Sequence, residues 1–275
     1  MEYMLSKEKN ISHHATILPM LVAMFGKPNM VMAEVGVWDG NSLAVYLNTL
    51  KSLNGKVYLI DWWKGSKYVG DGLNMKWKDE IYEKEYQQVL NIVETCDAKD
   101  NVVILRGDST DMAKHIKDGE LDLCFIDAGH SHEECLKDIK SYFPKVKKGG
   151  IMSGDDLDTH SLLLYLAQAN SFTEEELKTD AVKGIGHPGV LQAVFDCFHD
   201  NIVPFNDGWY TFAGYRIVRG CVGVIEEEKA SLLDDDHMHN LMGPVHIKLM
   251  QDIINIERDI ELEFKYHSNS IEPKF

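Results

Sequence analysis

Three aspartates follow the ends of two apolar runs, which makes them candidates for metal binding. Asp127 ends the run LDLCFID, and Asp155 and Asp156 end GGIMSGDD. Adjacent carboxylates repel each other unless they face water or share a positive charge. If the two runs are neighbouring parallel strands, their carboxyl ends lie about 5 Å apart and the three carboxylates converge. Such oxygen ligands suit Mg²⁺ or Mn²⁺ better than zinc, so we expect a divalent cation here. The alternative is that the acidic pair consists of a helix N-cap and a solvated neighbour.

A second group of candidate residues lies earlier, where the run VMAEVGV meets a glycine-containing turn. Glu34 closes the run, Gly36 and Gly40 allow a tight turn, and Asn41 or Ser42 opens a helix. Glycine lets a ligand approach backbone N–H groups that a side chain would screen, although a plain strand-to-helix turn uses glycine as well. The spacing differs from the dinucleotide-binding pattern G-x-G-x-x-G.

Acidic residues also follow the next two apolar runs. Asp61 ends KVYLID, about 20 residues after the glycine turn, where an acid can bind both hydroxyls of a ribose. Asp108 and Ser109 follow NVVILRG. Because the functional residues of a parallel sheet lie beyond the carboxyl ends of its strands, we expect these acids along one edge.

The elements that must position these residues alternate along the chain. The strand-like runs are VMAEVGV, KVYLID, NVVILRGD, LDLCFID, GGIMSGD, Asn201–Phe205 and Trp209–Arg219. Helical periodicity is present in Ala15–Phe25, Ser42–Leu53, Asp79–Cys96, Met112–Lys117, His132–Val146 and Val190–His199. This alternation predicts an α/β fold, with a Rossmann-like, seven-stranded, mostly parallel sheet and helices on both faces. We expect this domain to span residues 1–225, followed by a C-terminal helical extension over residues 226–275.

Composition restricts the class of protein further. The chain has 275 residues, of which 44% are hydrophobic, enough for the core of one large domain. No apolar run is long enough to span a bilayer, and the N-terminus lacks the order of a secretory signal, so we expect no membrane partner. The five cysteines form no C-x-x-C pair, which favours a reducing, cytoplasmic location. A formal net charge of -16 disfavours nucleic-acid binding.

The glycine turn and the two acids after it resemble, in this order, the class I S-adenosylmethionine-dependent methyltransferases. The resemblance implies that Glu34, Gly36 and Gly40 face the methionine part of the donor. It further implies that Asp61 binds the ribose and that Trp62 lies against the adenine. Asp108 and Ser109 would reach the adenine, and Ser42 and Asp127 are also expected at the donor site. Trp38 stands where many members have a glycine.

The segment FIDAGHSHEECLKDIKSYFPKVKKGGIMSGDD looks like the metal-dependent small-molecule O-methyltransferases, including those that methylate macrolide sugars. This resemblance implies that Asp127, Asp155 and Asp156 hold Mg²⁺ and that His130 is the catalytic base. The chemistry agrees, because a cation stabilises the alkoxide and a neutral imidazole accepts a proton at neutral pH. His132, two residues later, is the alternative base.

Two further segments are candidates for covering the site. The insertion 62–78 is too long for an ordinary connection and rich in aromatic residues, which favours a lid over a surface excursion. The run Thr159–Gly189 follows the acidic pair directly and could form the acceptor wall, with His160 or His187 near the metal.

The C-terminal extension combines an acidic segment with an amphipathic helix. Its apolar side chains recur at spacings of four, three and four residues, at Leu249, Ile253, Ile256 and Ile260. Such a stripe must be buried, either on the same chain or on a second copy. We expect a homodimer or a higher homo-oligomer formed through this helix.

The sequence therefore predicts an S-adenosylmethionine-dependent, Mg²⁺-assisted O-methyltransferase that acts on a small hydroxylated acceptor. A non-catalytic binding or assembly protein that keeps the fold is one alternative. A nicotinamide-dependent oxidoreductase is a second, although the dinucleotide glycines that it requires are missing.

Overall fold

The computed structural model describes residues 16–64, 79–182, 185–205, 207–217 and 225–227. The chain divides into two units, Met1–Ile217 with Ile225–Ala230, and Val218–Val224 with Ser231–Phe275. The second unit lies outside the described residues, as do most of the expected lid (62–78) and the expected C-terminal helix. All described elements belong to the first unit.

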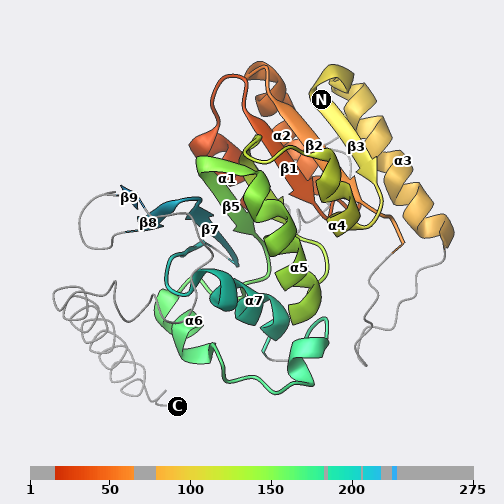
Figure 1. The fold of residues 1–275 in the computed structure, drawn as a ribbon. Coiled ribbons are helices and arrows are strands. Elements are labelled where there is room, and N and C mark those ends of the chain that lie inside the picture. Colours follow the sequence, from red (N-terminus) through yellow and green to blue (C-terminus); the bar gives the residue numbers. More distant parts are fainter. Residues whose placement is uncertain (1–15, 65–78, 183–184, 206, 218–224, 228–275) are drawn as a thin grey trace, which may run out of the picture. The chain divides into compact units, whose positions relative to one another are not determined.

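A seven-stranded sheet forms the centre of this unit (Figure 1). Its strands, in chain order, are β1 (Val31–Val35), β2 (Lys56–Asp61), β3 (Val102–Arg106), β4 (Leu121–Ile126), β5 (Val146–Gly154), β6 (Val203–Phe205) and β7 (Gly208–Phe212). Their order across the sheet is β3-β2-β1-β4-β5-β7-β6. Six strands run in the same direction, and β7 runs opposite to them. The predicted Rossmann-like, mostly parallel sheet is therefore confirmed.

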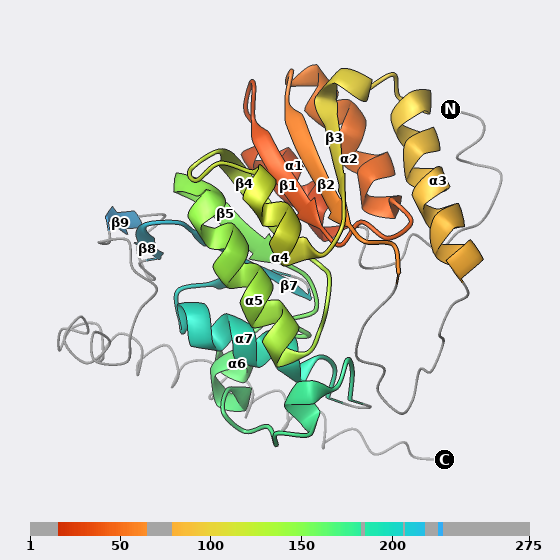
Figure 2. The same cartoon turned by 45° about the vertical axis from the view of Figure 1, so that its right-hand side comes forward.

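Helices cover both faces of the sheet (Figure 2). They are α1 (Ile17–Phe25), α2 (Asn41–Ser52), α3 (Asp79–Thr95), α4 (Ser109–Met112), α5 (His132–Tyr142), α6 (Leu162–Gln168) and α7 (Pro188–Phe198). Side chains alternate along β1, so that Met32 packs against α1, α2 and α3 while Ala33 and Val35 pack on the opposite side with α5, α6 and α7. Each large apolar side chain buried in these layers contributes roughly 1.5 to 3 kcal/mol.

The chain reverses its direction of winding at β1, and this reversal positions the candidate residues. Successive strands build outward from β1 to β2 and β3, and the chain then returns to place β4 on the other side of β1. Val35 pairs with Ile126, so β1 and β4 end at the same level. Ligands of open α/β sheets bind in the crevice at such a switch point.

The largest difference from expectation lies in the last predicted strand, Trp209–Arg219. β7 ends at Phe212, and the chain turns at Gly214, whose φ of 73° is unfavourable for residues with a side chain. It then forms β8 (Tyr215–Ile217), which pairs with β9 (Ile225–Glu227) in a separate two-stranded sheet. The helix expected at Met112–Lys117 instead begins at Ser109 and gives way to a 3-10 turn after Met112.

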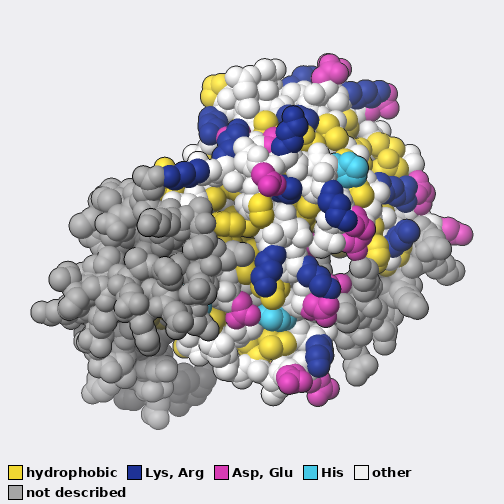
Figure 3. Space-filling view, viewed as in Figure 1, with side chains coloured by type: hydrophobic (Ala, Val, Ile, Leu, Met, Phe, Trp, Pro, Cys, Tyr) yellow, Lys and Arg dark blue, Asp and Glu magenta, His cyan; other side chains and the backbone are white. Residues whose placement is uncertain are grey.

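The outer surface of the α4 and α5 layer carries mixed charge (Figure 3). Lys and Arg side chains lie among Asp and Glu side chains there, and some form exposed ion pairs, such as Lys137 with Glu133 on α5 and Lys114 with Asp111 on α4. Within the described residues, no helix has both the length and the apolar character needed to cross a membrane.

Candidate active site

The acidic residues singled out in the sequence emerge from neighbouring strands. β4 and β5 are parallel, and Ile126 pairs with Gly154 at their carboxyl ends. Asp127 and Asp155 therefore leave the sheet at the same level, one residue beyond that pair. The Asp155 backbone N–H donates to the Ile126 carbonyl at 3.1 Å, which continues the pairing into the loop. Asp155 and Asp156 are almost fully buried, so a solvated acidic pair is excluded.

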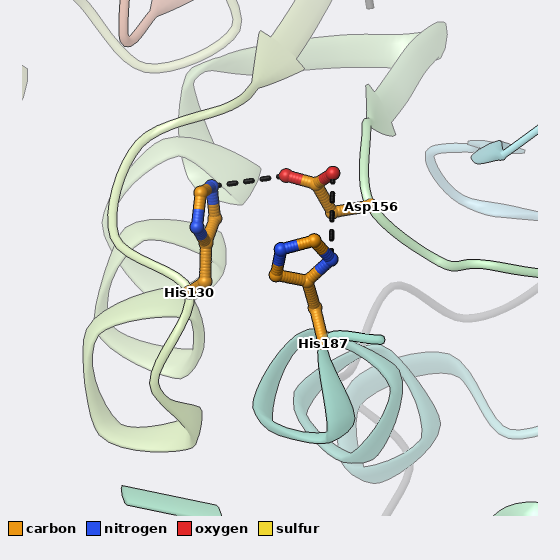
Figure 4. Close-up of side chains that lie close together, drawn as sticks. All are labelled: His130, Asp156 and His187. Atoms are coloured by element: carbon orange, nitrogen blue, oxygen red, sulfur yellow. Dashed lines mark ion pairs between the residues drawn. The ribbon is translucent and has the colours of Figure 1, made fainter. Parts of the chain in front are cut away.

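Asp156 is turned into the site by its backbone. Its φ of 59° lies in the left-handed region, which asparagine and aspartate adopt more readily than other residues with a side chain. One carboxylate oxygen, Oδ2, lies 2.9 Å from His130 Nε2, and the other lies 3.5 Å from His187 Nδ1 (Figure 4). Asp127 Oδ1 lies 3.7 Å from the same His130 nitrogen. His130 thus faces the acids that follow both strands.

The two histidines considered as a base have different partners. His130 Nδ1 lies 2.9 Å from Oδ1 of Asp180, which precedes α7. His132 Nε2 lies 2.7 Å from Asp196 Oδ2 on α7. Only His130 has its second ring nitrogen beside Asp127 and Asp156, so geometry favours His130 over His132 as the catalytic residue.

His187 immediately precedes α7, and its side chain extends into the site. Asp158 Oδ2 accepts from the His187 backbone N–H at 2.5 Å and lies 3.0 Å from Nδ1 of the same residue. The imidazole lies edge-on to His130, with 4.8 Å between ring centroids. Of the two histidines suggested from the acceptor segment, the structure brings His187 to the acids and leaves His160 exposed.

Close packing fixes the beginning of α7 against the loop that carries His130. A Cβ on Gly189 would lie 2.4 Å from both the His130 carbonyl oxygen and the His132 nitrogen. Any side chain at this position would push the helix away from the loop. Gly189 therefore keeps His187 and His130 close together.

The pKa values of His130 and Asp127 depend on each other. Burial lowers the pKa of His130, but the hydrogen-bonding contacts with Asp127, Asp156 and Asp180 outweigh it and hold the pKa well above its usual value. Burial raises the pKa of Asp127 to about 6, although His130 opposes the shift. A protonated His130 would therefore stabilise the carboxylates beside it.

The same site has the donor groups for a divalent cation. Among the described residues, His130, Asp156 and His187 each present one ligand atom, and these atoms lie within 4.8 Å of one another. His130 Nε2 is buried without a well-directed hydrogen bond, although Asp156 is near. Such an atom fits a site that binds a cation. The sequence predicted three carboxylate ligands, and the structure brings His130 and His187, both singled out in the sequence, beside Asp156.

The expected donor residues surround the loop after β1. Asp61, at the end of β2, accepts from the backbone N–H groups of Val37 and Trp38 at 3.0 and 2.9 Å through Oδ2, and from Trp63 at 2.6 Å through Oδ1. The Trp63 indole donates to the Trp38 carbonyl at 2.8 Å. Asp61 therefore ties together the two loops in which the donor is expected.

Gly36 belongs to the loop after β1, called the donor loop below, and lies against Asp127. Its φ is 89°, and a Cβ there would lie 1.7 Å from the Asp127 carbonyl oxygen. Trp38, which replaces a glycine of the resembling family, adopts a positive φ of 49° and is more than half exposed. Its indole donates to Glu85 on α3 at 2.7 Å. The loop thus keeps a left-handed backbone at position 38 without glycine.

Glu34 and Ser42 lie behind this loop and contact each other. The Ser42 hydroxyl donates to one Glu34 oxygen, and the Tyr46 hydroxyl donates to the other at 2.6 Å. Burial raises the pKa of Glu34 to about 7. Both oxygens are thus engaged with α2, an arrangement that sequence spacing did not indicate. Gly40, with a φ of 74°, precedes α2.

The residues expected at the adenine begin α4. Asp108 caps the helix, accepting from the Thr110 hydroxyl at 2.7 Å, and is half-buried. The Ser109 hydroxyl points instead to the buried Asp138 of α5 and donates to it. Trp62 is half-buried at the end of β2.

Comparison with known proteins supports the domain assignment. Residues 33–157 match the family model described as a methyltransferase domain. A comparison with curated protein sequences found no match.

Solved structures with a similar arrangement include the O-methyltransferase NovP, at 16% identity and a TM-score of 0.47, covering 74% of this chain and 78% of that one. CalS11, a TDP-rhamnose 3'-O-methyltransferase of calicheamicin biosynthesis, is 15% identical with a TM-score of 0.47, covering 73% and 79% of the respective chains. Rv0187 from MTB is 13% identical with the same score, covering 73% and 79%.

The match to a methyltransferase domain comes from the sequence comparison. That match extends from β1 to the loop after β5 and so includes the glycine turn, Asp61 and the acids at the ends of β4 and β5. Residues 33–157 therefore match a methyltransferase domain, and the strand order around them is that of a Rossmann-like sheet.

Proposed function

We propose that this chain is an S-adenosylmethionine-dependent methyltransferase that transfers a methyl group to a hydroxyl oxygen of a small molecule, assisted by a divalent cation. The observation that carries the proposal is the position of His130 Nε2, 2.9 Å from Asp156 and 3.7 Å from Asp127 at the carboxyl ends of two adjacent strands. A base and carboxylate ligands at one point suit deprotonation of an alcohol.

The donor is expected on the β1 and β2 side of this point. S-Adenosylmethionine supplies a methyl group that a sulfonium already activates, so the chain must mainly orient the two reactants. Asp61, half-buried where the loops meet, is proposed to bind the ribose, with Trp62 and Asp108 near the adenine. Gly36 lets the donor loop lie directly against Asp127.

The cation is proposed to be Mg²⁺ or Mn²⁺, held by Asp127, Asp155 and Asp156. Bound there, it would supply positive charge that lowers the pKa of the acceptor hydroxyl. With the carboxylates neutralised by the cation, His130 would be neutral and would accept the proton at Nε2, because Nδ1 is engaged with Asp180. Asp180 holds the ring so that this nitrogen faces the acceptor side.

The acceptor is proposed to bind beside His130 and His187, against the segment that joins β5 to α7. This segment includes α6 and returns to the site at Asp180 and His187. With a net charge of -16 on the chain, an acceptor with a phosphate backbone is disfavoured.

The test is methyl transfer from labelled S-adenosylmethionine to a panel of hydroxylated metabolites, with and without excess EDTA. We expect turnover with at least one hydroxyl acceptor, loss of turnover on chelation, and donor affinity by calorimetry that is largely unchanged. Full activity in EDTA would exclude the cation, and transfer only to nitrogen or carbon would exclude O-methylation. Donor binding without transfer to any acceptor would favour a non-catalytic binding protein.

A further inference from the structure

His187 has a different origin from the carboxylates of the proposed cation site. It lies immediately before α7, more than 30 residues after Asp156, yet its Nδ1 is 3.5 Å from Asp156 Oδ1. Figure 4 shows its ring directed toward the space between Asp156 and His130. The ligand atoms of these three residues lie within 4.8 Å of one another. An ion bound to Asp156 would therefore lie within reach of His187.

The backbone fixes His187 before any ligand arrives. Asp158, which has a positive φ of 56°, accepts from the His187 backbone N–H and lies 3.0 Å from its ring nitrogen. A Cβ on Gly186 would lie 2.2 Å from Asp158 Oδ2, so only glycine permits this approach. Gly189 packs on the His130 loop in the same way. A preorganised imidazole loses little freedom on binding an ion.

The hydrogen bond to Asp158 also determines which ring nitrogen of His187 can bind an ion. With its proton on Nδ1 toward Asp158, the imidazole keeps the electron pair of Nε2, the ring nitrogen that Figure 4 shows on the side of His130. Histidines that bind metals commonly donate their other ring N–H to a carboxylate in this manner. His187 with Asp158 therefore has the structure of a metal-ligating histidine supported by its neighbour.

We propose that His187 is a nitrogen ligand of the divalent cation, so that the site prefers a first-row transition ion such as Mn²⁺ over Mg²⁺. The inference rests on the cation-assisted function proposed above and specifies its metal. Mg²⁺ binds carboxylates and water and retains its hydration shell, whereas imidazole nitrogen suits transition ions better. His130 keeps the role of base, and His187 is the ligand.

The first experiment measures binding of Mn²⁺ and of Mg²⁺ to the full chain by calorimetry. We expect Mn²⁺ to bind at least about 10-fold more tightly than Mg²⁺, and His187→Asn to remove most of this preference. Asparagine suits a helix N-cap, so the variant is expected to fold. The matched control is His160→Asn, an exposed histidine of the same segment, which should leave both affinities unchanged. Equal affinity for the two ions in the wild type would overturn the proposal.

The second experiment identifies the nitrogen directly. Pulsed electron paramagnetic resonance of bound Mn²⁺ should detect ¹⁴N coupling that changes to ¹⁵N coupling when the histidines are ¹⁵N-labelled. The coupling should vanish in His187→Asn and persist in His130→Asn. Persistence in His187→Asn, or absence from the wild type, would refute His187 as a ligand. Circular dichroism and donor affinity verify that each variant is folded.

These results are separable from those of the proposed function. Nitrogen coupling together with EDTA-insensitive methyl transfer would keep His187 as a ligand and remove the cation from catalysis. EDTA-sensitive transfer without nitrogen coupling would keep the function and reject the ligand.

Discussion

Nδ1 of His130 and Oδ1 of Asp180 lie 2.9 Å apart, although 50 residues separate them in the sequence. The contact joins the loop after β4 to the segment that precedes α7. It engages one nitrogen of the proposed base and leaves the other beside Asp127 and Asp156. The pKa of Asp180 is lowered chiefly by this contact, so Asp180 remains ionised as a partner for the ring.

Asp180→Asn should lower kcat by about 10² to 10⁴, because an amide allows the wrong tautomer of the base. KM for the donor should change less than kcat, since Asp180 acts through the His130 ring. Steady-state kinetics measure both. Asp196→Asn is the matched control, since it breaks the similar pair with His132 and should leave kcat nearly unchanged. Equal losses in the two variants would assign Asp180 a merely structural role.

Asp61→Ala should weaken S-adenosylmethionine binding by at least about 10-fold, because a carboxylate that binds two ribose hydroxyls makes charged hydrogen bonds. The substitution also releases the backbone N–H groups of Val37, Trp38 and Trp63. Calorimetry measures the affinity, and Asp111→Ala on α4 serves as an exposed control. Unchanged affinity in a folded variant would remove Asp61 from the donor site.

Glu34 should make the protein less stable as pH rises. Its folded pKa, about 7, lies above the ordinary value of 4.5, so the folded state binds the proton more tightly than the unfolded state. The resulting stabilisation is present at low pH and is lost as pH rises from 4.5 through about 7. The difference amounts to roughly 3 kcal/mol in the free energy of unfolding.

Glu34→Gln tests this dependence, because glutamine cannot ionise. Between about pH 4.5 and pH 8, the wild type should lose roughly 3 kcal/mol of stability relative to the variant. Urea denaturation at each pH measures it. Parallel pH profiles for the two proteins would show that Glu34 keeps an ordinary pKa.

Gly189→Ala should reduce the free energy of unfolding by about 1 to 3 kcal/mol through overpacking against the His130 loop. It should also lower kcat, since α7 and the loop must separate. Gly119→Asn is the control, because a side chain at this left-handed position meets nothing within 4 Å and asparagine tolerates the conformation. Urea denaturation and steady-state kinetics on both variants measure these effects. Unchanged stability and kcat in Gly189→Ala would contradict the close packing.

The apolar stripe Leu249, Ile253, Ile256 and Ile260 lies outside the described residues and remains a prediction. In the full chain, Ile253→Glu with Ile256→Glu should convert a dimer to a monomer, because charges would be buried in a helix pairing. Light scattering measures the mass. A monomeric wild type, or an oligomer that survives both substitutions, would oppose assembly through this helix.

Periodicity and strand-end acids were sufficient to predict the sheet and the elements around it. Each strand of the parallel part is a short apolar run, and local pattern decides such elements. The order of the strands was not predicted, because the pairing of β1 with β4 joins runs that are distant in the sequence. The break at Gly214 was missed, because an apolar run with one glycine is consistent with a single strand.

The site was harder to predict, since its contacts join residues distant in the sequence. Asp127, Asp155 and Asp156 were identifiable because strand ends concentrate function. Asp158 and Asp180 were not, because an acid in a loop has no sequence signal until its partner is known. The contacts of Glu34 with Ser42 and Tyr46 were also missed, although side chains at alternate positions of β1 face the α2 layer.

The switch of winding at β1 divides the protein into two parts that can be redesigned separately. The donor loop depends on β1, β2 and α2, whereas the segment between β5 and α7 belongs to the other half of the sheet. That segment is connected to the reacting groups through a few anchors, notably Asp158, Asp180 and Gly189. On the function proposed above, exchanging α6 and its flanking loops while keeping these anchors would alter which alcohols are accepted without rebuilding the donor site.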